Sequence, residues 1–131
     1  MTSATASAGV AAPPSTRSEF ADAAGKISAL GADTSGWVLP LSLEAPNGVQ
    51  NDVMSWVWAS GGTMLEDGQP DLTNDDVHSA VDFIKGLWDD KVIAPGSFTM
   101  KEQDKVEEFT NGRVGMMIDS LAHINLIRET N

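Results

Sequence analysis

The chain has 131 residues, of which 41% are hydrophobic, which is enough for one domain with a buried core. A net charge of -11 argues against a nucleic-acid-binding protein, which needs a basic surface, and against attachment to anionic lipid. The chain contains no cysteine, so disulfides, thiolate zinc sites and a cysteine nucleophile are excluded.

The first 14 residues are small or polar and show no hydrophobic periodicity, which predicts a flexible tail or linker over residues 1–14. They lack the basic leader and the apolar core of a signal peptide. No run of about 18 apolar residues predicts a membrane-spanning helix. Residues 15–131 are expected to form a single α/β unit.

The folded part begins with an amphipathic helix and a strand. Thr16 is a predicted N-cap, with Glu19 three residues later as in a capping box. Apolar residues recur at helical spacing as far as Leu30. The apolar run Trp37–Leu41 then predicts a strand that is covered on both faces, as in a parallel sheet.

A polar loop leads to a second helix, predicted over residues 50–60, that carries Trp56 and Trp58. Positions two residues apart on a helix point about 200° apart, so the two rings cannot face the same way. We expect one ring to pack in the core and the other to face a loop or cleft, and we assign Trp56 to the candidate ligand site. The alternative is that both rings belong to the core.

The rest of the chain predicts a hairpin, three helices and one strand. Asp67-Gly68 is a typical hairpin turn within residues 63–72, and Thr73 is expected to cap the longest helix. A short charged helix over residues 101–110 precedes a second strand, Val114–Ile118. The last helix has an apolar face without a predicted partner, and a sheet of two strands is marginal alone. The chain therefore reads as part of something larger, or as a subunit that pairs with another chain.

No catalytic signature occurs in the chain. The acidic stretch 66–71 lacks the spacing of an EF-hand loop, and His78 and His123 are too distant in sequence to form a local pair. There is no nucleophile, phosphate-binding or zinc motif. We predict a protein that is not an enzyme, with no cofactor and no metal site.

Several segments, in this order, resemble extracellular solute-binding proteins of family 1, the sugar-binding components of bacterial ABC transporters. They are AGVAAPPSTRSEF, GWVLPL, WASGG and VEEFTNGRVGMMID, within residues 8–131. Arg17 and Ser18 stand where that family usually has Trp and Asp. The resemblance implies two α/β lobes around a ligand cleft in a protein about three times as long. The chain would be an internal fragment covering most of one periplasmic-binding-protein-like lobe, with helices packed on a small sheet.

The resemblance also implies a ligand site in the two loops that follow the strands, residues 43–51 and 119–123. Independently of it, the carboxyl ends of neighbouring parallel strands are where open α/β sheets bind ligands. Neither loop contains Arg or Lys, which favours a neutral polyol over a phosphate. His123 lies where the family often has a stacking aromatic residue and would partly replace it. Together with Trp56, the predicted ligand-binding residues are Glu44, Asn47, Asn51, Asp119, Ser120 and His123.

The function implied is the substrate-binding component for carbohydrate import by an ABC transporter. The expected partners are a sugar or oligosaccharide and the transporter's permease subunits. The full-length form would be extracytoplasmic, either periplasmic or a cell-surface lipoprotein. One lobe alone should bind sugar weakly or not at all. The alternative is a non-catalytic interaction or oligomerisation module that uses exposed apolar helices.

Overall fold

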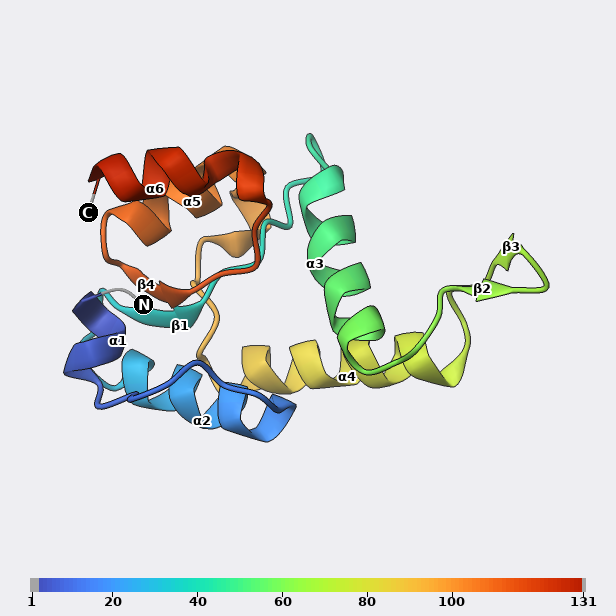
Figure 1. Cartoon of the computed structure of the whole chain (residues 1–131), viewed down its shortest axis with the longest axis horizontal. Coiled ribbons are helices and arrows are strands. Elements are labelled where there is room, and N and C mark those ends of the chain that lie inside the picture. The colour runs from blue at the N-terminus through green and yellow to red at the C-terminus, as the bar shows by residue number, and fades with distance from the viewer. Residues whose placement is uncertain (1–2, 131) are drawn as a thin grey trace.

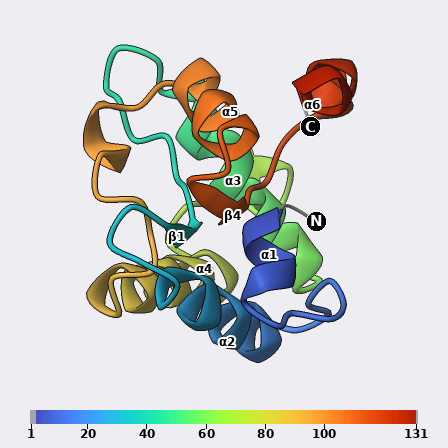
Figure 2. The same cartoon turned by 90° about the vertical axis from the view of Figure 1, so that its left-hand side faces the viewer.

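A computed structural model describes residues 3–130 and has the mixed α/β fold that the sequence predicts, with helices on both sides of a small parallel sheet (Figures 1 and 2). Below the sheet in Figure 1 lie α1, α2 and α4, and above it lie α5 and α6, while α3 stands beside it. The helices are α1 (Ser3–Ser7), α2 (Arg17–Ser28), α3 (Asn47–Ala59), α4 (Asp75–Asp89), α5 (Glu102–Thr110) and α6 (Ile124–Thr130).

The sheet pairs β1 (Ser35–Trp37) with β4 (Val114–Met116) in parallel. Trp37 also forms a parallel bridge to Ile93 on its other side. The first strand begins two residues earlier than predicted and ends at Trp37 instead of Leu41. The second begins at Val114 as predicted and ends at Met116 instead of Ile118. After Trp37 the chain leaves the ladder, although Val38 and Leu39 remain buried. The two strands run in the same direction, so the loops that follow them leave the sheet at the same edge.

The core centres on four aromatic rings, one from each of α2, β1, α3 and α4. Trp56 lies edge-on to Phe20 and to Phe83, with ring centroids 4.9 Å and 4.8 Å apart. Trp37 packs against the same cluster, 5.9 Å from Trp56. Edge-to-face pairs add about 0.5–1.5 kcal/mol each to the stability gained from burial. The cluster therefore fixes α3 against the sheet.

The starts of α2 and α4 lie within one residue of the prediction. The Thr16 hydroxyl accepts a hydrogen bond from the backbone N–H of Glu19 at 3.1 Å, as predicted. The longest helix, α4, begins one residue later than predicted. Its N-cap is Asn74 instead of Thr73, and the Asn74 side chain accepts from the N–H of Val77 at 2.9 Å. Both residue types are good N-caps, so composition alone does not distinguish the two positions.

The amino-terminal segment differs from the flexible tail predicted over residues 1–14. Residues 3–7 form α1, which packs on α2 and β4, and Ala4 and Val10 are buried. The Thr5 hydroxyl donates a hydrogen bond to the carbonyl oxygen of Gly115 at 3.0 Å. The small side chains that suggested a linker instead allow a close approach to the sheet.

A hairpin of β2 (Leu65–Glu66) and β3 (Gln69–Pro70) projects away from the body (Figure 1). Its turn residues Asp67 and Gly68 both have positive φ, 50° and 77°. Two consecutive positive φ values are the signature of a type I′ turn, for which Asp-Gly is a preferred sequence. The predicted hairpin is confirmed.

Replacing Gly36 by Ala is expected to lower the free energy of unfolding by about 1–3 kcal/mol. A Cβ at this position would lie 2.4 Å from the backbone of Ala24, where α2 crosses β1. The backbone cannot yield as a flexible side chain would. Gly31→Ala is the matched control, since its Cβ would meet nothing within 4 Å. Urea unfolding measures both, and equal midpoints would contradict the close packing of α2 on β1.

Candidate functional site

A cavity of about 320 Å³ lies between α3 and the segment that leaves β4. It is therefore at the carboxyl edge of the parallel sheet, where open α/β folds present ligand-binding groups. Its lining combines amide, hydroxyl and carboxylate groups with one large aromatic ring. The lining residues are Gln50, Asn51, Met54, Ser55, Trp58, Glu102, Lys105, Ile118, Asp119 and Ser120.

Three of the predicted site residues meet in this cavity. Asn51 comes from α3, and Asp119 and Ser120 come from the turn after β4. These positions are 68 residues apart in sequence, since 119 − 51 = 68. The expectation that the two loops lie side by side on one rim is met at these residues.

Glu44 and Asn47 do not line the cavity. Glu44 is exposed and forms an ion pair with Lys101, with Oε2 and Nζ 2.7 Å apart. The hydrogen bond and the charge of Lys101 hold the pKa of Glu44 below its usual value. Asn47 is exposed at the first turn of α3. The loop before α3 and the first turn of that helix therefore place these two residues outside the cavity.

The assignment of Trp56 to a ligand-facing position is wrong for this cavity. Trp56 is 9% exposed within the aromatic core, whereas Trp58 is 57% exposed and lines the cavity. The two rings do point apart, as helical geometry requires. The buried stripe of α3 runs through Gly48, Asp52 and Trp56. Because this buried stripe includes the acidic residue Asp52, the hydrophobic pattern of the sequence does not reveal it.

His123 holds a site residue instead of stacking on a ligand. It lies in a short 3₁₀ turn, Leu121–His123, and its Nδ1 is 2.9 Å from Oδ2 of Asp119. The ring does not line the cavity. The contact orients the Asp119 carboxylate, so His123 contributes indirectly to the cavity.

Sequence reasoning missed two buried charged residues beneath the cavity. Lys105 of α5 is 1% exposed, and its ammonium donates to the carbonyl oxygen of Ile118 at 2.6 Å. Its Nζ lies 3.7 Å from Asp52 Oδ1 and 4.0 Å from Asp119 Oδ1. In the sequence, Lys105 sits within a charged helix and resembles a solvated residue, so composition offers no signal for its burial.

Asp52 of α3 has a fully buried side chain, and neither carboxylate oxygen has a hydrogen-bond partner. Burial raises the pKa of Asp52 to about 7, although the Lys105 ammonium acts in the opposite direction. The carboxyl group is therefore partly protonated at neutral pH, which reduces the charge held beneath the cavity.

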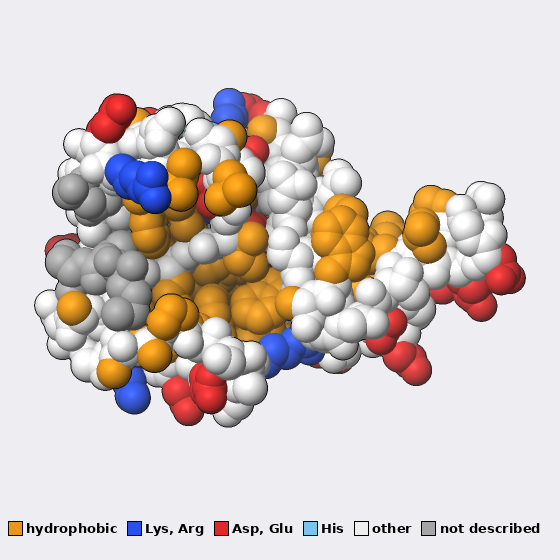
Figure 3. Space-filling model, in the orientation of Figure 1, with side chains coloured by type: hydrophobic (Ala, Val, Ile, Leu, Met, Phe, Trp, Pro, Cys, Tyr) orange, Lys and Arg blue, Asp and Glu red, His pale blue; other side chains and the backbone are white. Residues whose placement is uncertain are grey.

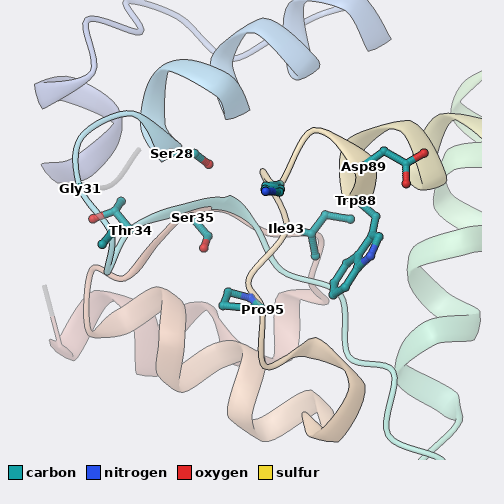
Figure 4. A pocket seen from close by; sticks show the side chains of 10 residues that line it. Ser28, Gly31, Thr34, Ser35, Trp88, Asp89, Ile93 and Pro95 are labelled. Atoms are coloured by element: carbon teal, nitrogen blue, oxygen red, sulfur yellow. The ribbon is translucent and has the colours of Figure 1, made fainter.

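A larger cavity, of about 590 Å³, lies at the other end of β1. Figure 4 shows Ser28, Thr34 and Ser35 on one side of it and Trp88 with Ile93 on the other. Ser35 is the first residue of β1, so this cavity is at the amino edge of the sheet. Neither predicted ligand loop lines it.

Two general features bear on the class of site. Within residues 3–130, no three His, Cys, Asp or Glu side chains are grouped in a way that could hold a metal ion. None of the helices in the described part of the chain has both the length and the apolar character needed to cross a membrane.

Solved structures of proteins with bound sugars share the fold of this chain. A solute-binding protein from Thermotoga lettingae, bound with α-D-tagatose, aligns with a TM-score of 0.84 and 23% identity over 99% of this chain. A sugar transporter from Arthrobacter chlorophenolicus, with bound laminaribiose, gives 0.80 and 22% over 97%. Maltose-bound MalE3 of T. maritima gives 0.72 and 26% over 87%. The chain has the fold of one segment of a solute-binding protein. The predicted resemblance is confirmed at the level of fold.

The match covers only part of each relative, 34%, 32% and 29% of the three solved chains in the same order. Among curated proteins, relatives from Brucella abortus and Brucella suis are 30% identical over 125 residues, 93% of this chain. Their names give them an unproven binding role. The chain spans 29% of the length of these relatives. No family model matches the chain.

Proposed function

We propose that the cavity between α3 and the turn after β4 binds a neutral sugar. One observation carries this proposal: the exposed indole of Trp58 lies in the same cavity as Asn51, Asp119 and Ser120. An indole face packs on the apolar face of a sugar ring. The amide, carboxylate and hydroxyl groups beside it suit the hydroxyls at the ring edge.

The charges of the cavity favour a neutral ligand over an anion. Its only cation among the lining residues is Lys105, which is 1% exposed and already donates to Ile118. Glu102 and Asp119 add negative charge at the rim. An anionic ligand such as a phosphate would meet these carboxylates without an accessible cation to offset them.

The names of the structural neighbours support the same class of ligand, since they describe proteins with bound tagatose, laminaribiose or maltose. We extend the proposal to the role of a substrate-binding component for carbohydrate import, which docks on permease subunits outside the cytoplasmic membrane. Residues 15–131 would then form part of one lobe, and the protein would not be an enzyme.

The chain alone is expected to bind sugar weakly, because one face of the ligand meets no second lobe. A dissociation constant on the order of 1 mM corresponds to only about -4 kcal/mol. An NMR titration with maltose, laminaribiose and tagatose should shift the Trp58 indole N–H and the amides of Asn51 and Asp119. Trp58→Ala should weaken binding about tenfold, because it removes the stacking surface, whereas Trp58→Phe should keep most of it.

The control for this titration is Trp88→Phe, which changes an aromatic ring at the larger cavity. It should leave the sugar response unchanged. A sugar response that maps to the larger cavity, or one that survives Trp58→Ala at full strength, would contradict the proposed site. So would the absence of any shift at ligand concentrations of about 50 mM, which is far above the expected dissociation constant.

A second candidate function is association through apolar surface. None of the side chains of α6 is buried. Leu126, on this helix, is 42% exposed, and Leu121, shortly before it, is 83% exposed. Hydrophobic side chains also gather in a hollow at the centre of the face in Figure 3. Light scattering distinguishes the two functions, because association predicts a mass that rises with concentration and no response to sugar.

A further inference from the structure

Lys105 is an unusual residue for a protein interior. Its side chain is 1% exposed although it carries a charged ammonium. Removing such a group from water is costly, so a buried lysine is stable only with polar partners around it. The partners of Lys105, and the parts of the fold to which they belong, therefore indicate its role.

The partners of Lys105 come from the two sides of the candidate cavity. On one side, Asp52 Oδ1 of α3 is 3.7 Å from the ammonium. On the other, the Ile118 carbonyl oxygen accepts a hydrogen bond at 2.6 Å, and Asp119 Oδ1 lies 4.0 Å away. The ammonium therefore joins α3 to the segment that leaves β4.

Each partner adjoins a residue that lines the cavity. Asp52 follows Asn51 in α3, and Ile118 precedes Asp119 at the exit of β4. A shift of the Ile118 carbonyl group turns the next peptide and moves the Asp119 side chain with it. His123 also contacts the Asp119 carboxylate, with Nδ1 3.0 Å from Oδ1 and 2.9 Å from Oδ2.

We infer that Lys105 is a positioning residue, which sets the distance and orientation between Asn51 and the turn after β4 through its contacts with Asp52 and Ile118. Lys105 borders the cavity but is only 1% exposed, so it would act on the ligand through Asp52 and Ile118. The effect of Lys105 on the turn after β4 can be tested without a sugar. The consequence for ligand affinity rests on the proposed function.

The test must separate positioning from simple loss of stability. Lys105→Met alone would leave Asp52 buried without a partner and could unfold the chain, so the informative variant is the double change Asp52→Asn with Lys105→Met. It removes both buried charges while keeping their volume. Lys101→Met is the control at the N-cap of the same helix, because Lys101 is exposed and pairs with Glu44 outside the cavity.

We expect the double variant to fold, with amide hydrogen exchange of residues 119–123 faster by about tenfold than in wild type, because a charged hydrogen bond is lost there. Exchange in α2 and α4 should not change, and Lys101→Met should resemble wild type throughout. Unchanged exchange at residues 119–123, or an equal increase in every element, would overturn the inference.

Sugar titration of the same proteins separates the two proposals. If wild type binds sugar, the double variant should bind at least about tenfold more weakly, and Lys101→Met should bind normally. Faster exchange at residues 119–123 without any sugar response in wild type would support the positioning role and contradict the proposed function. Normal sugar binding by a double variant with unchanged exchange would contradict the positioning role alone.

Discussion

Replacing Trp56 by Ala is expected to lower the free energy of unfolding by about 3–5 kcal/mol, because a large buried aromatic side chain leaves a cavity that its neighbours cannot fill. The ring touches Phe20, Trp37 and Phe83, which come from α2, β1 and α4. Chemical denaturation followed by circular dichroism measures the loss.

Trp58→Ala is the matched control for this prediction, because it removes the same side chain two residues away on the same helix. Trp58 is 57% exposed, so its loss should change stability by about 0.5 kcal/mol or less. The two variants should therefore have different effects. Trp56→Ala should lower stability, and Trp58→Ala should weaken sugar binding. Equal destabilisation by both would contradict this difference between a buried and an exposed tryptophan.

Local sequence chemistry predicted most of the fold. The Thr16 N-cap and the Asp67-Gly68 turn each depend on interactions between residues close in sequence, and both occur in the structure. The parallel pairing of β1 and β4 is a long-range feature. The sequence indicates only that the first strand is covered on both faces, as in a parallel sheet.

The candidate site was predicted only in outline. Asn51, Asp119 and Ser120 meet because they follow strands that are neighbours, which is a rule about topology. The choice between Trp56 and Trp58 depends on where Phe20 and Phe83 lie, and no property of α3 alone decides it. The amino-terminal helix was missed for a related reason. Its small residues carry little hydrophobic signal, although they fit closely against β4.

The charge near a site cannot be inferred from the composition of its loops alone, as Lys105 shows. The two loops contain no Arg or Lys, which led to the expectation of a neutral ligand. The cation that lies nearest to Asp119 comes from α5 instead. Lys105 is buried and its ammonium is hydrogen-bonded to the Ile118 carbonyl group, so it stabilises the turn and is not accessible to an anion. The neutral-ligand expectation therefore rests on burial as well as composition.

The protein is expected to lose stability as the pH rises from about 4 to 8, with Asp52 responsible for part of the loss. Burial raises the pKa of this carboxyl group from 3.8 to about 7 in the folded state. The folded state therefore holds the proton more tightly than the unfolded chain, so the stabilisation is complete below pH about 4 and disappears as the pH passes 7. The largest possible contribution is about 4 kcal/mol, from about three pH units at 1.36 kcal/mol each.

Asp52→Asn isolates this contribution, since an amide of nearly the same shape does not titrate. Urea unfolding of wild type and Asp52→Asn at pH 5 and pH 8 should show a smaller loss in the variant. Asp22→Asn, at an exposed position of α2, should keep the wild-type slope and controls for the general acidity of the chain. Equal slopes in wild type and Asp52→Asn would mean that Asp52 stays ionised throughout, fully compensated by Lys105. In that case the buried pair would act as a permanent ion pair beneath the cavity, and the turn after β4 would be held with the same strength at every pH in this range.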